Sequence, residues 1–248
     1  MKLSILGATG ETGQQMVELA LARGHQVKAL VRRPEALRAR HENLEIVVGD
    51  ARDPAIIEEL TTGQDGIICS LGIPASGSTK AEIDDSERPD VCLVSTQLLF
   101  EAMPRHGVSR IVLMSTHSAG TSNDGSAYSN WLRDLVKNRI DDKDDMEAFI
   151  ASSDAPVDWT VIRNPAIYEG EKGRDYDVYT QITLDRSSQI TYADLAEFAV
   201  SEVENPQHVG QFLTITEPLE TADFMASAQP APVTRKCRLE KGLSEETY

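Results

Sequence analysis

The sequence predicts an α/β fold in which a doubly wound parallel sheet forms a single domain. Short apolar runs alternate with segments of helical spacing along most of the chain. The apolar runs are continuous, as expected for strands that are buried on both faces of a parallel sheet. In addition, Gly7, Gly10 and Gly13 directly follow the first apolar run, as in a phosphate-binding turn between a strand and a helix.

The first half of the chain alternates regularly. Residues 3–6 form the first predicted strand, and the spacing of Met16, Val17 and Ala20 predicts a helix over 11–23. Apolar runs predict the next strands, and a proline in the first turn supports each of the short helices between them. In order, these elements are a strand at 26–31, a helix at 34–40, a strand at 44–48, a helix at 54–60 and a strand at 66–70.

The second half continues the alternation with two longer interruptions. Polar residues 73–90 and 118–130 follow the fourth and fifth strands. Because ligands bind at the carboxyl ends of such strands, each segment is either a lid over a site or a plain solvent loop. The remaining predicted elements are a helix at 91–103, a strand at 110–114, a helix at 139–152, a strand at 158–163, a helix at 194–203 and a strand at 212–216.

The composition is that of a globular chain that does not bind polyanions. Its 248 residues can form one large α/β domain, and the formal charge of −16 would repel nucleic acids and anionic membrane surfaces. No apolar stretch approaches the roughly 20 residues of a membrane span, and the first strand leaves no room for a signal peptide. Cys69 and Cys92 lie in apolar runs as core thiols, and the histidines lack metal-ligand spacing. We therefore expect a cytoplasmic protein without a metal.

The glycine turn predicts a dinucleotide site. Gly7 permits a tight turn, Gly10 lets the backbone approach a pyrophosphate, and Gly13 lets the helix pack closely on the strand. The unbonded N–H groups at the start of the helix then face the phosphates. The alternative is an ordinary loop between a strand and a helix. The candidate cofactor-binding residues here are Gly7, Ala8, Thr9, Gly10, Glu11, Thr12 and Gly13.

The end of the second strand favours NADP(H) over NAD(H). A fold that is specific for NAD carries a carboxylate here, which binds the adenosine ribose. This chain has Arg32 and Arg33, and its next acid is Glu35. Guanidinium groups suit a 2′-phosphate because they can form charge-assisted bidentate bonds with it. The alternative is that the two arginines form a solvated surface pair.

The spacing Gly-x-x-Gly-x-x-Gly resembles the turn of the extended and atypical branches of the short-chain dehydrogenase/reductase superfamily. This resemblance implies that Asp50 and Ala51, after the third strand, lie beside the adenine amino group. The alternative for Asp50 is a helix cap or a turn aspartate. After the fourth strand, the chain would run beside the pyrophosphate and the ribose through Ser70, Leu71 and Gly72.

Most members of this superfamily use a Tyr-x-x-x-Lys pair, whose spacing places both side chains on one helix face. The tyrosine protonates the reduced carbonyl, and the lysine binds the nicotinamide ribose. Here Lys143 and Glu147 match the Lys-x-x-x-Glu of atypical members, and Arg139 occupies the place of the tyrosine. Tyr168 and Lys172 have the same spacing but lie outside any predicted helix, so we reject them as the pair.

Short motifs beyond the turn extend the resemblance over about residues 1–216. They lie at 30–32, 47–50, 70–72, 110–112, 141–142, 158–165 and 179–185. Together they resemble the NAD(P)H-binding atypical reductases, a group that includes the NADPH-dependent flavin reductase (biliverdin-IX beta reductase) and the NmrA-like proteins. The resemblance implies a Rossmann-like NAD(P)-binding fold. Ala166 departs from the pattern, because the flavin reductase has a histidine there.

Without a tyrosine, the site is expected to favour acceptors that tolerate protonation from solvent, such as flavins, quinones or conjugated tetrapyrroles. We therefore expect an NADP(H)-dependent oxidoreductase that transfers hydride to a conjugated small-molecule acceptor. The candidate catalytic residues are Ser115, Lys143 and His117, of which His117 is a candidate proton donor. The other candidate cofactor-binding residues are Met114, Ser115, Thr116, Lys143, Asn164, Pro165, Ala166 and Ile167.

These residues have alternative roles. Ser115 and Thr116 could bond loop backbone, Lys143 could be a solvated charge among four aspartates, and His117 could lie in a surface loop. The whole protein could instead be a non-catalytic NAD(P)-binding redox sensor that binds a protein partner. An isomerase or epimerase is a third alternative, although the sequence offers it no acid–base pair.

We expect two parts in the chain. Residues 1–216 form the NAD(P)-binding domain, with the substrate pocket built by its C-terminal loops. Residues 217–248 form an extended C-terminal tail, through which the chain could form a homodimer or bind a protein partner.

Overall fold

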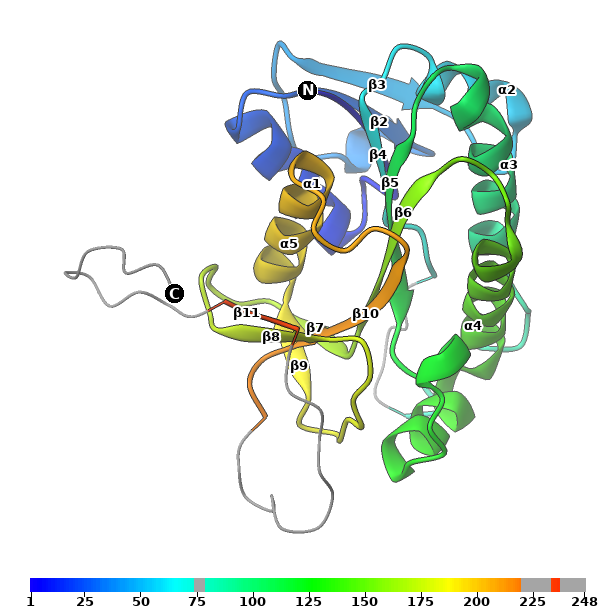
Figure 1. Ribbon diagram of the computed structural model, residues 1–248, viewed down its shortest axis with the longest axis vertical. Helices are drawn as coiled ribbons and strands as arrows, with labels where there is room; N and C mark the ends of the chain where they lie inside the picture. The colour runs from blue at the N-terminus through cyan, green and yellow to red at the C-terminus, as the bar shows by residue number, and fades with distance from the viewer. Residues whose placement is uncertain (74–78, 220–232, 237–248) are drawn as a thin grey trace, which may run out of the picture.

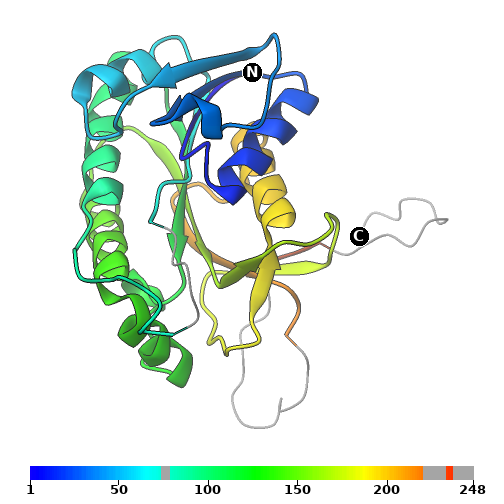
Figure 2. The same cartoon turned by 180° about the vertical axis from the view of Figure 1, so that it is seen from behind.

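The computed structural model, which describes residues 1–73, 79–219 and 233–236, has three layers. A sheet lies in the middle, with helices on both faces (Figure 1, and from behind in Figure 2). One face is covered by α1 (Glu11–Ala22) and α5 (Tyr192–Glu204), and the other by α2 (Pro54–Thr61), α3 (Val91–Arg105) and α4 (Ala127–Ser152). The expected α/β fold with a doubly wound parallel sheet is confirmed.

Nine strands of the described residues form the sheet, in the order β11-β8-β10-β6-β5-β4-β1-β2-β3. The pairs from β3 through β6 to β10 are parallel, whereas β8 pairs antiparallel with β10 and β11. The strands are β1 (Lys2–Leu6), β2 (Gln26–Val31), β3 (Leu44–Val48), β4 (Gly66–Cys69), β5 (Arg110–Thr116), β6 (Asp158–Asn164), β8 (Tyr176–Tyr179), β10 (Gln211–Thr216) and β11 (Thr234–Lys236). Two further strands, β7 (Ala166–Tyr168) and β9 (Gln189–Thr191), form a separate small sheet.

The strand order reverses between β1 and β4. From β1 the chain proceeds outward to β2 and β3, and it then returns to place β4 on the opposite side of β1. The chain therefore leaves β1 and β4 towards opposite faces of the sheet, which makes this the topological switch point. In open α/β sheets, ligands bind in the crevice at this switch point.

Apolar residues on both faces of the sheet explain why the strands read as continuous hydrophobic runs. Ile5 packs into the cluster beneath α1 and α5, whereas its neighbour Leu6 packs into the cluster beneath α2, α3 and α4. Both side chains are completely buried. Alternate residues of one strand thus serve two cores, as the parallel sheet requires.

Two sequence-based predictions are wrong. Only Pro34–Ala36 form a helical turn where a helix over 34–40 was expected, because the N–H of Arg38 donates to Gln14 Oε1 at 2.9 Å instead of to a helical carbonyl. The second error concerns the loop expected at 118–130. There α4 already begins at Ala127, because the Ser126 hydroxyl accepts from the N–H of Ser129 and caps the helix.

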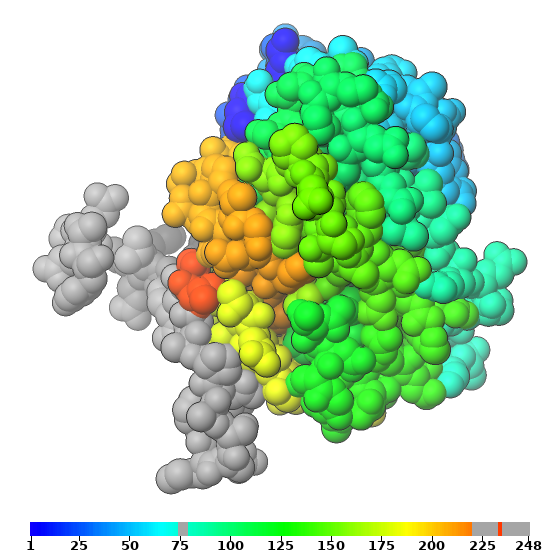
Figure 3. All heavy atoms as spheres, turned by 45° about the vertical axis from the view of Figure 1, so that its right-hand side comes forward, coloured from blue at the N-terminus to red at the C-terminus, as the bar shows by residue number. Residues whose placement is uncertain are grey.

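The C-terminal tail lies largely outside the described residues. Of the expected segment 217–248, the structure describes 217–219 and 233–236. Thr234 pairs with Val178 of β8, and its hydroxyl lies 3.1 Å from His208 Nε2, so β11 adds an edge strand to the sheet. In the space-filling view, this red segment lies against orange residues of the domain (Figure 3). Among the helices described, none is both long and apolar enough to cross a bilayer.

His117 is completely buried, so the surface-loop alternative is wrong. His117 follows β5 directly, and its backbone N–H donates to the Asn164 carbonyl at 2.8 Å. The ring packs 5.7 Å from that of Tyr128, and Nδ1 lies 3.2 Å from Thr214 Oγ1. Burial lowers the pKa of His117 from 6.5 to about 4, because the charged ring would lose its hydration.

Replacing His117 by asparagine should flatten the pH dependence of the free energy of unfolding. The folded pKa lies below the unfolded value, so the stability is fully present above pH 6.5 and is lost as the pH falls towards 4. Between pH 7 and pH 5 the wild-type protein should lose about 2 kcal/mol through this residue. Denaturant unfolding at both pH values measures the difference. The exposed His41→Asn variant is the control and should keep the wild-type dependence, and a His117→Asn variant that keeps it too would contradict the account.

Candidate functional site

The candidate residues lie at one end of the sheet. They follow the carboxyl ends of β1 to β6, which are neighbours in the sheet, and Lys143 reaches the same end from α4. In Figure 1, this end of β5 points towards the lower half of the molecule, where β7, β9 and the first turns of α4 lie. The sheet topology therefore gathers segments that are up to about 160 residues apart in sequence.

The three positions of the turn differ in whether the surrounding structure leaves room for a side chain. A Cβ on Gly7, which has a φ of +77°, would lie 2.2 Å from the Ser70 carbonyl oxygen. A Cβ on Gly13 would lie 2.1 Å from the Gly7 oxygen. Gly10 has no such neighbour, since its Cβ would meet only the Gly7 oxygen at 3.5 Å. The protein's own packing thus requires Gly7 and Gly13, whereas Gly10 leaves room for another molecule's atoms.

Helix α1 begins at this open position. Gly10 is its N-cap and has no side chain with which to bond the N–H groups of the first turn. These groups and the positive end of the helix dipole form a site for an anion. The carboxylate of Glu11 also lies in the first turn, but Arg38 pairs with it at 3.0 Å. The residues present therefore fit the pyrophosphate of a dinucleotide.

Arg32 and Arg33 lie at the end of β2, one strand away from the glycine turn. Both side chains are exposed, and neither forms an ion pair with any residue in the described ranges. Arg32 lies close enough to Asp50 to help lower the pKa of that carboxyl group. Two unpaired guanidinium groups at this position suit a phosphate on the adenosine ribose.

Asp50 is already engaged by a neighbouring arginine. Its Oδ2 accepts from Arg52 at 2.8 Å, and its Oδ1 accepts from the Arg52 side chain at 3.1 Å and backbone at 2.9 Å. These bonds lower its pKa from 3.8 to about 2. Arg52 also binds Asp90 at 3.1 Å and so ties this loop to the start of α3. Asp50 therefore serves at least in part as a turn aspartate.

The Lys143 ammonium lies between the ends of β4 and β5. It donates to the Leu71 carbonyl at 2.8 Å and to the Met114 carbonyl at 2.6 Å. The residue is only 9% exposed, so the surface-charge alternative is wrong. An ammonium has three donors, and these bonds use two of them. No described residue uses the third.

Ser115 does not bond loop backbone, in contrast to one alternative. Its hydroxyl donates to Glu147 Oε1 at 2.6 Å, and Arg163 binds the other oxygen of the same carboxylate at 2.5 Å. All three residues are at most 3% exposed. Thr116 does follow the backbone alternative, because its hydroxyl lies 3.3 Å from the His117 carbonyl and 3.5 Å from that of Asn164.

The segment after β6 lies beside the end of β5. Asn164 is the register partner of Thr116, and its side-chain amide donates to the Pro165 carbonyl at 2.9 Å. Pro165 is buried, Ala166 is exposed and Ile167 is half-buried at the start of β7. His117 bonds the Asn164 carbonyl through its backbone N–H, and its ring atom Nε2 is buried without a hydrogen-bond partner among the described residues.

Arg139, at the place of the missing tyrosine, and the rejected pair Tyr168 and Lys172 all have other partners in the structure. Arg139 donates to the carboxylate of Asp85 at 3.2 Å and to the Asp84 carbonyl at 2.8 Å, so it anchors the preceding loop. Tyr168 lies in strand β7 and donates to Glu217, whereas Lys172 pairs with Glu197 at 3.2 Å. Tyr168 and Lys172 share no helix, which agrees with their rejection as a catalytic pair.

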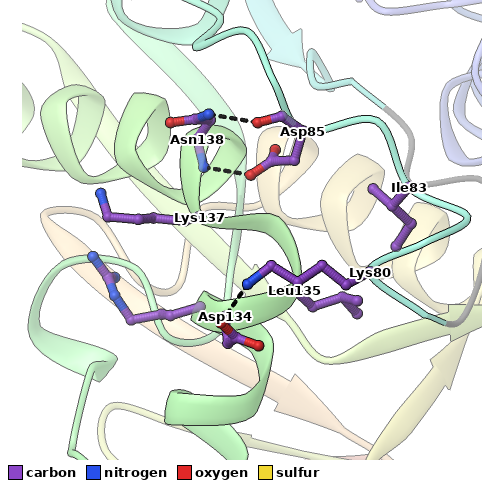
Figure 4. Close-up of a pocket in the computed structure, with 8 residues that line it drawn as sticks. Lys80, Ile83, Asp85, Asp134, Leu135, Lys137 and Asn138 are labelled. Carbon is purple, nitrogen blue, oxygen red and sulfur yellow. Dashed lines mark hydrogen bonds and ion pairs between the residues drawn. The ribbon is translucent and has the colours of Figure 1, made fainter.

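Residues 79–90 pack along α4 and are not a plain solvent loop; residues 74–78 lie outside the described ranges. Ile83 is 6% exposed and packs with Val136 and Ile140. A groove of about 350 Å³ separates the two segments, and the pairs Lys80–Asp134 and Asp85–Asn138 bridge it (Figure 4). The groove lies away from the glycine turn, so it is not part of the candidate dinucleotide site.

Two buried contacts of the site were not predicted from the sequence. The first is the partner of Arg163, although an arginine within an apolar strand needs one. The second is made by Asp142, whose two oxygens accept from the N–H groups of Cys92 and Leu93 at 3.0 Å each. Asp142 thereby caps α3 from α4. The helical spacing of Asp142 with the apolar residues Met146 and Ile150 was the available signal.

Comparisons with known proteins agree with this geometry. The chain is 31% identical over 133 residues to sterol demethylase protein B of Methylococcus capsulatus, a match that covers 53% of this chain and 39% of that protein. The chain thus spans about two fifths of the length of this curated relative. An oxidoreductase from Lactococcus lactis has a similar structure, with a TM-score of 0.68 and 21% identity over 88% of this chain and 91% of that one.

An anaerobilin reductase from Escherichia coli O157:H7 also has a similar structure. Its TM-score is 0.67, with 17% identity over 88% of this chain and 98% of that chain. At these identities, the two structures show a shared Rossmann-like fold. The family described as NAD(P)H-binding matches residues 7–206, a range that begins at the glycine turn and extends just beyond α5. The chain therefore belongs to the NAD(P)H-binding family.

Proposed function

We propose that the protein is an NADP(H)-dependent oxidoreductase that transfers hydride to a conjugated small-molecule acceptor such as a flavin, a quinone or a tetrapyrrole. The position of Lys143 carries this proposal, because its ammonium is fixed beside the switch point with one donor still available. Membership of the NAD(P)H-binding family supports the class of cofactor. The names of the structural neighbours, an oxidoreductase and a reductase, support the reaction by analogy of fold.

Each part of the candidate site has a distinct proposed task. The α1 N-terminus binds the pyrophosphate, Arg32 and Arg33 bind the 2′-phosphate, and Lys143 holds the nicotinamide ribose. When bound, the reduced nicotinamide supplies the hydride. Asn164, Pro165, Ala166 and Ile167, beside the end of β5, would shape the space next to the ring. Fixing the acceptor against the ring is the main catalytic task of the protein.

The surroundings of the site favour an acceptor that takes its proton from water. The guanidinium of Arg139, one helical turn before Lys143, donates to Asp84 and Asp85 in the preceding loop. His117 is neutral at pH 7 because its pKa is lowered to about 4, which makes it a poor proton donor. Reduction of a simple ketone needs an ordered acid, whereas a conjugated acceptor delocalises the charge that it gains.

Replacing both Arg32 and Arg33 by alanine should erase a preference for NADPH over NADH. Equilibrium binding, measured by fluorescence titration, should show that the wild-type protein prefers NADPH by about tenfold or more, since charge-assisted bonds contribute about 1.5–3 kcal/mol each. Arg40→Ala is the matched control, because the guanidinium of Arg40 bonds the carbonyls of Leu37 and Ala39. Equal affinities of the wild-type protein for both cofactors would refute the assignment to NADP(H).

Replacing Lys143 by alanine should weaken NADPH binding by about 1–3 kcal/mol, because a charge-assisted bond to the ribose would be lost. The same change should slow NADPH oxidation in an anaerobic assay with a panel of flavins, quinones and tetrapyrroles. The control is Lys137→Ala, on the same helix, whose exposed ammonium pairs only with Asp141 among the described residues. Arg139→Ala should also leave the chemistry nearly unchanged.

Two outcomes of this assay would contradict the proposal. Unchanged binding and turnover in Lys143→Ala would show that the active site lies elsewhere. If the wild-type protein binds NADPH but oxidises it with no acceptor in the panel, the non-catalytic redox sensor becomes the better explanation.

A further inference from the structure

Two residues one turn apart on α4 hold two consecutive residues at the end of β5. Lys143 Nζ donates to the Met114 carbonyl at 2.6 Å, and Glu147 Oε1 accepts from the Ser115 hydroxyl at 2.6 Å. A spacing of four residues places both side chains on one face of the helix. Helix α4 thus fixes the end of the strand at which we place the nicotinamide.

Arg163 keeps Glu147 in its position. Its Nε donates to Glu147 Oε1 at 3.1 Å and to Oε2 at 3.2 Å, and its Nη2 donates to Oε2 at 2.5 Å. Arg163 is also the register partner of Ser115 in the sheet, so all three side chains meet at one level. Gly120 closes over them, because a Cβ there would lie 2.1 Å from Glu147 Oε2.

This arrangement fixes the direction of the serine hydrogen bond. A carboxylate that is paired with an arginine can only accept, so the bond to Glu147 uses the single proton of Ser115. The two lone pairs of the Ser115 oxygen remain. The hydroxyl can therefore accept a further hydrogen bond from a ligand, but it cannot donate one.

We propose that the buried Glu147–Arg163 pair makes Ser115 an obligate hydrogen-bond acceptor, so that the ligand group it contacts must be an N–H or O–H donor. Glu147 is then a positioning residue, and Ser115 does not protonate the acceptor. This inference rests on the proposed function. The donor has two candidate sources, which are the carboxamide N–H of the nicotinamide and an N–H of the conjugated acceptor itself.

A cofactor without the carboxamide donor tests the first source. In the reduced 3-acetylpyridine analogue of NADPH, an acetyl group replaces the amide, so the carbonyl remains but the N–H is lost. Titration without any acceptor should show that the wild-type protein binds NADPH about fivefold more tightly than the analogue, the effect of one neutral hydrogen bond. In Ser115→Ala, the two affinities should become equal.

Steady-state kinetics test the second source. If the acceptor supplies the donor, Ser115→Ala should raise the KM for the acceptor by about fivefold and leave the preference between the two cofactors unchanged. Either result supports the inference, and the pattern identifies the ligand that Ser115 contacts.

The variant Glu147→Gln tests whether Glu147 orients the Ser115 hydroxyl or only stabilises the fold. Glutamine can still accept from Arg163, but its amide N–H can donate to Ser115, so the serine proton becomes free to bond the carbonyl of either cofactor. We expect this variant to discriminate less than the wild-type protein, because it binds the analogue more tightly, whereas Ser115→Ala binds NADPH more weakly. The matched control is Glu202→Gln, at the other end of the sheet, where a buried carboxylate pairs with Arg110 at 3.1 Å. It should lower the thermal midpoint without altering the discrimination.

Two results would overturn the inference. The first combines two measurements: the wild-type protein binds NADPH and the analogue equally well, and Ser115→Ala leaves the KM for the acceptor unchanged. NADPH binding would persist in that case, so the proposed function would stand. The second is a failure of the wild-type protein to bind NADPH at all, which would overturn the proposed function and this inference together.

Discussion

The close approach of the β1–α1 turn to the end of β4 is the constraint on which the site depends. Gly7 leaves no space for a Cβ beside the Ser70 carbonyl, and Gly13 leaves none beside Gly7. The first turn of α1 is therefore pressed against the backbone at the point where the strand order reverses. The N–H groups of this turn have no side-chain cap, so packing and the proposed anion binding have the same structural origin.

The buried charges of α4 extend this constraint to the other side of the crevice. Asp142 caps α3, Lys143 spans the ends of β4 and β5, and Glu147 joins β5 to β6 through Arg163. Each charge is buried and hydrogen-bonded, because an unpaired charge in this position would be costly. Since these bonds reach α3 and the ends of β4, β5 and β6, they hold the Lys143 ammonium at a fixed place in the sheet.

Much of the fold could be predicted from the sequence because local patterns determine it. The glycine turn and the continuous apolar strands needed no tertiary information, and β2 was predicted with its observed bounds, Gln26–Val31. The burial of His117 and the partner of Ser115 could not be predicted in this way. Both depend on tertiary contacts, since Thr214 lies 97 residues from His117, and Glu147 lies 32 residues from Ser115. The early start of α4 was missed, although Ser126 after a glycine is a helix-capping signal.

Hydride transfer at the carboxyl ends of β4 and β5 is the central proposal, and isotopic substitution tests it most directly. NADPH that carries deuterium at one or the other C4 position of the nicotinamide would be mixed with the protein and a flavin in a single anaerobic turnover. Under the proposal, Lys143 and α1 would fix the cofactor in one orientation, so deuterium at one position should slow the oxidation and deuterium at the other should not. Equal rates for the two labelled cofactors, or no oxidation at all, would contradict the proposal.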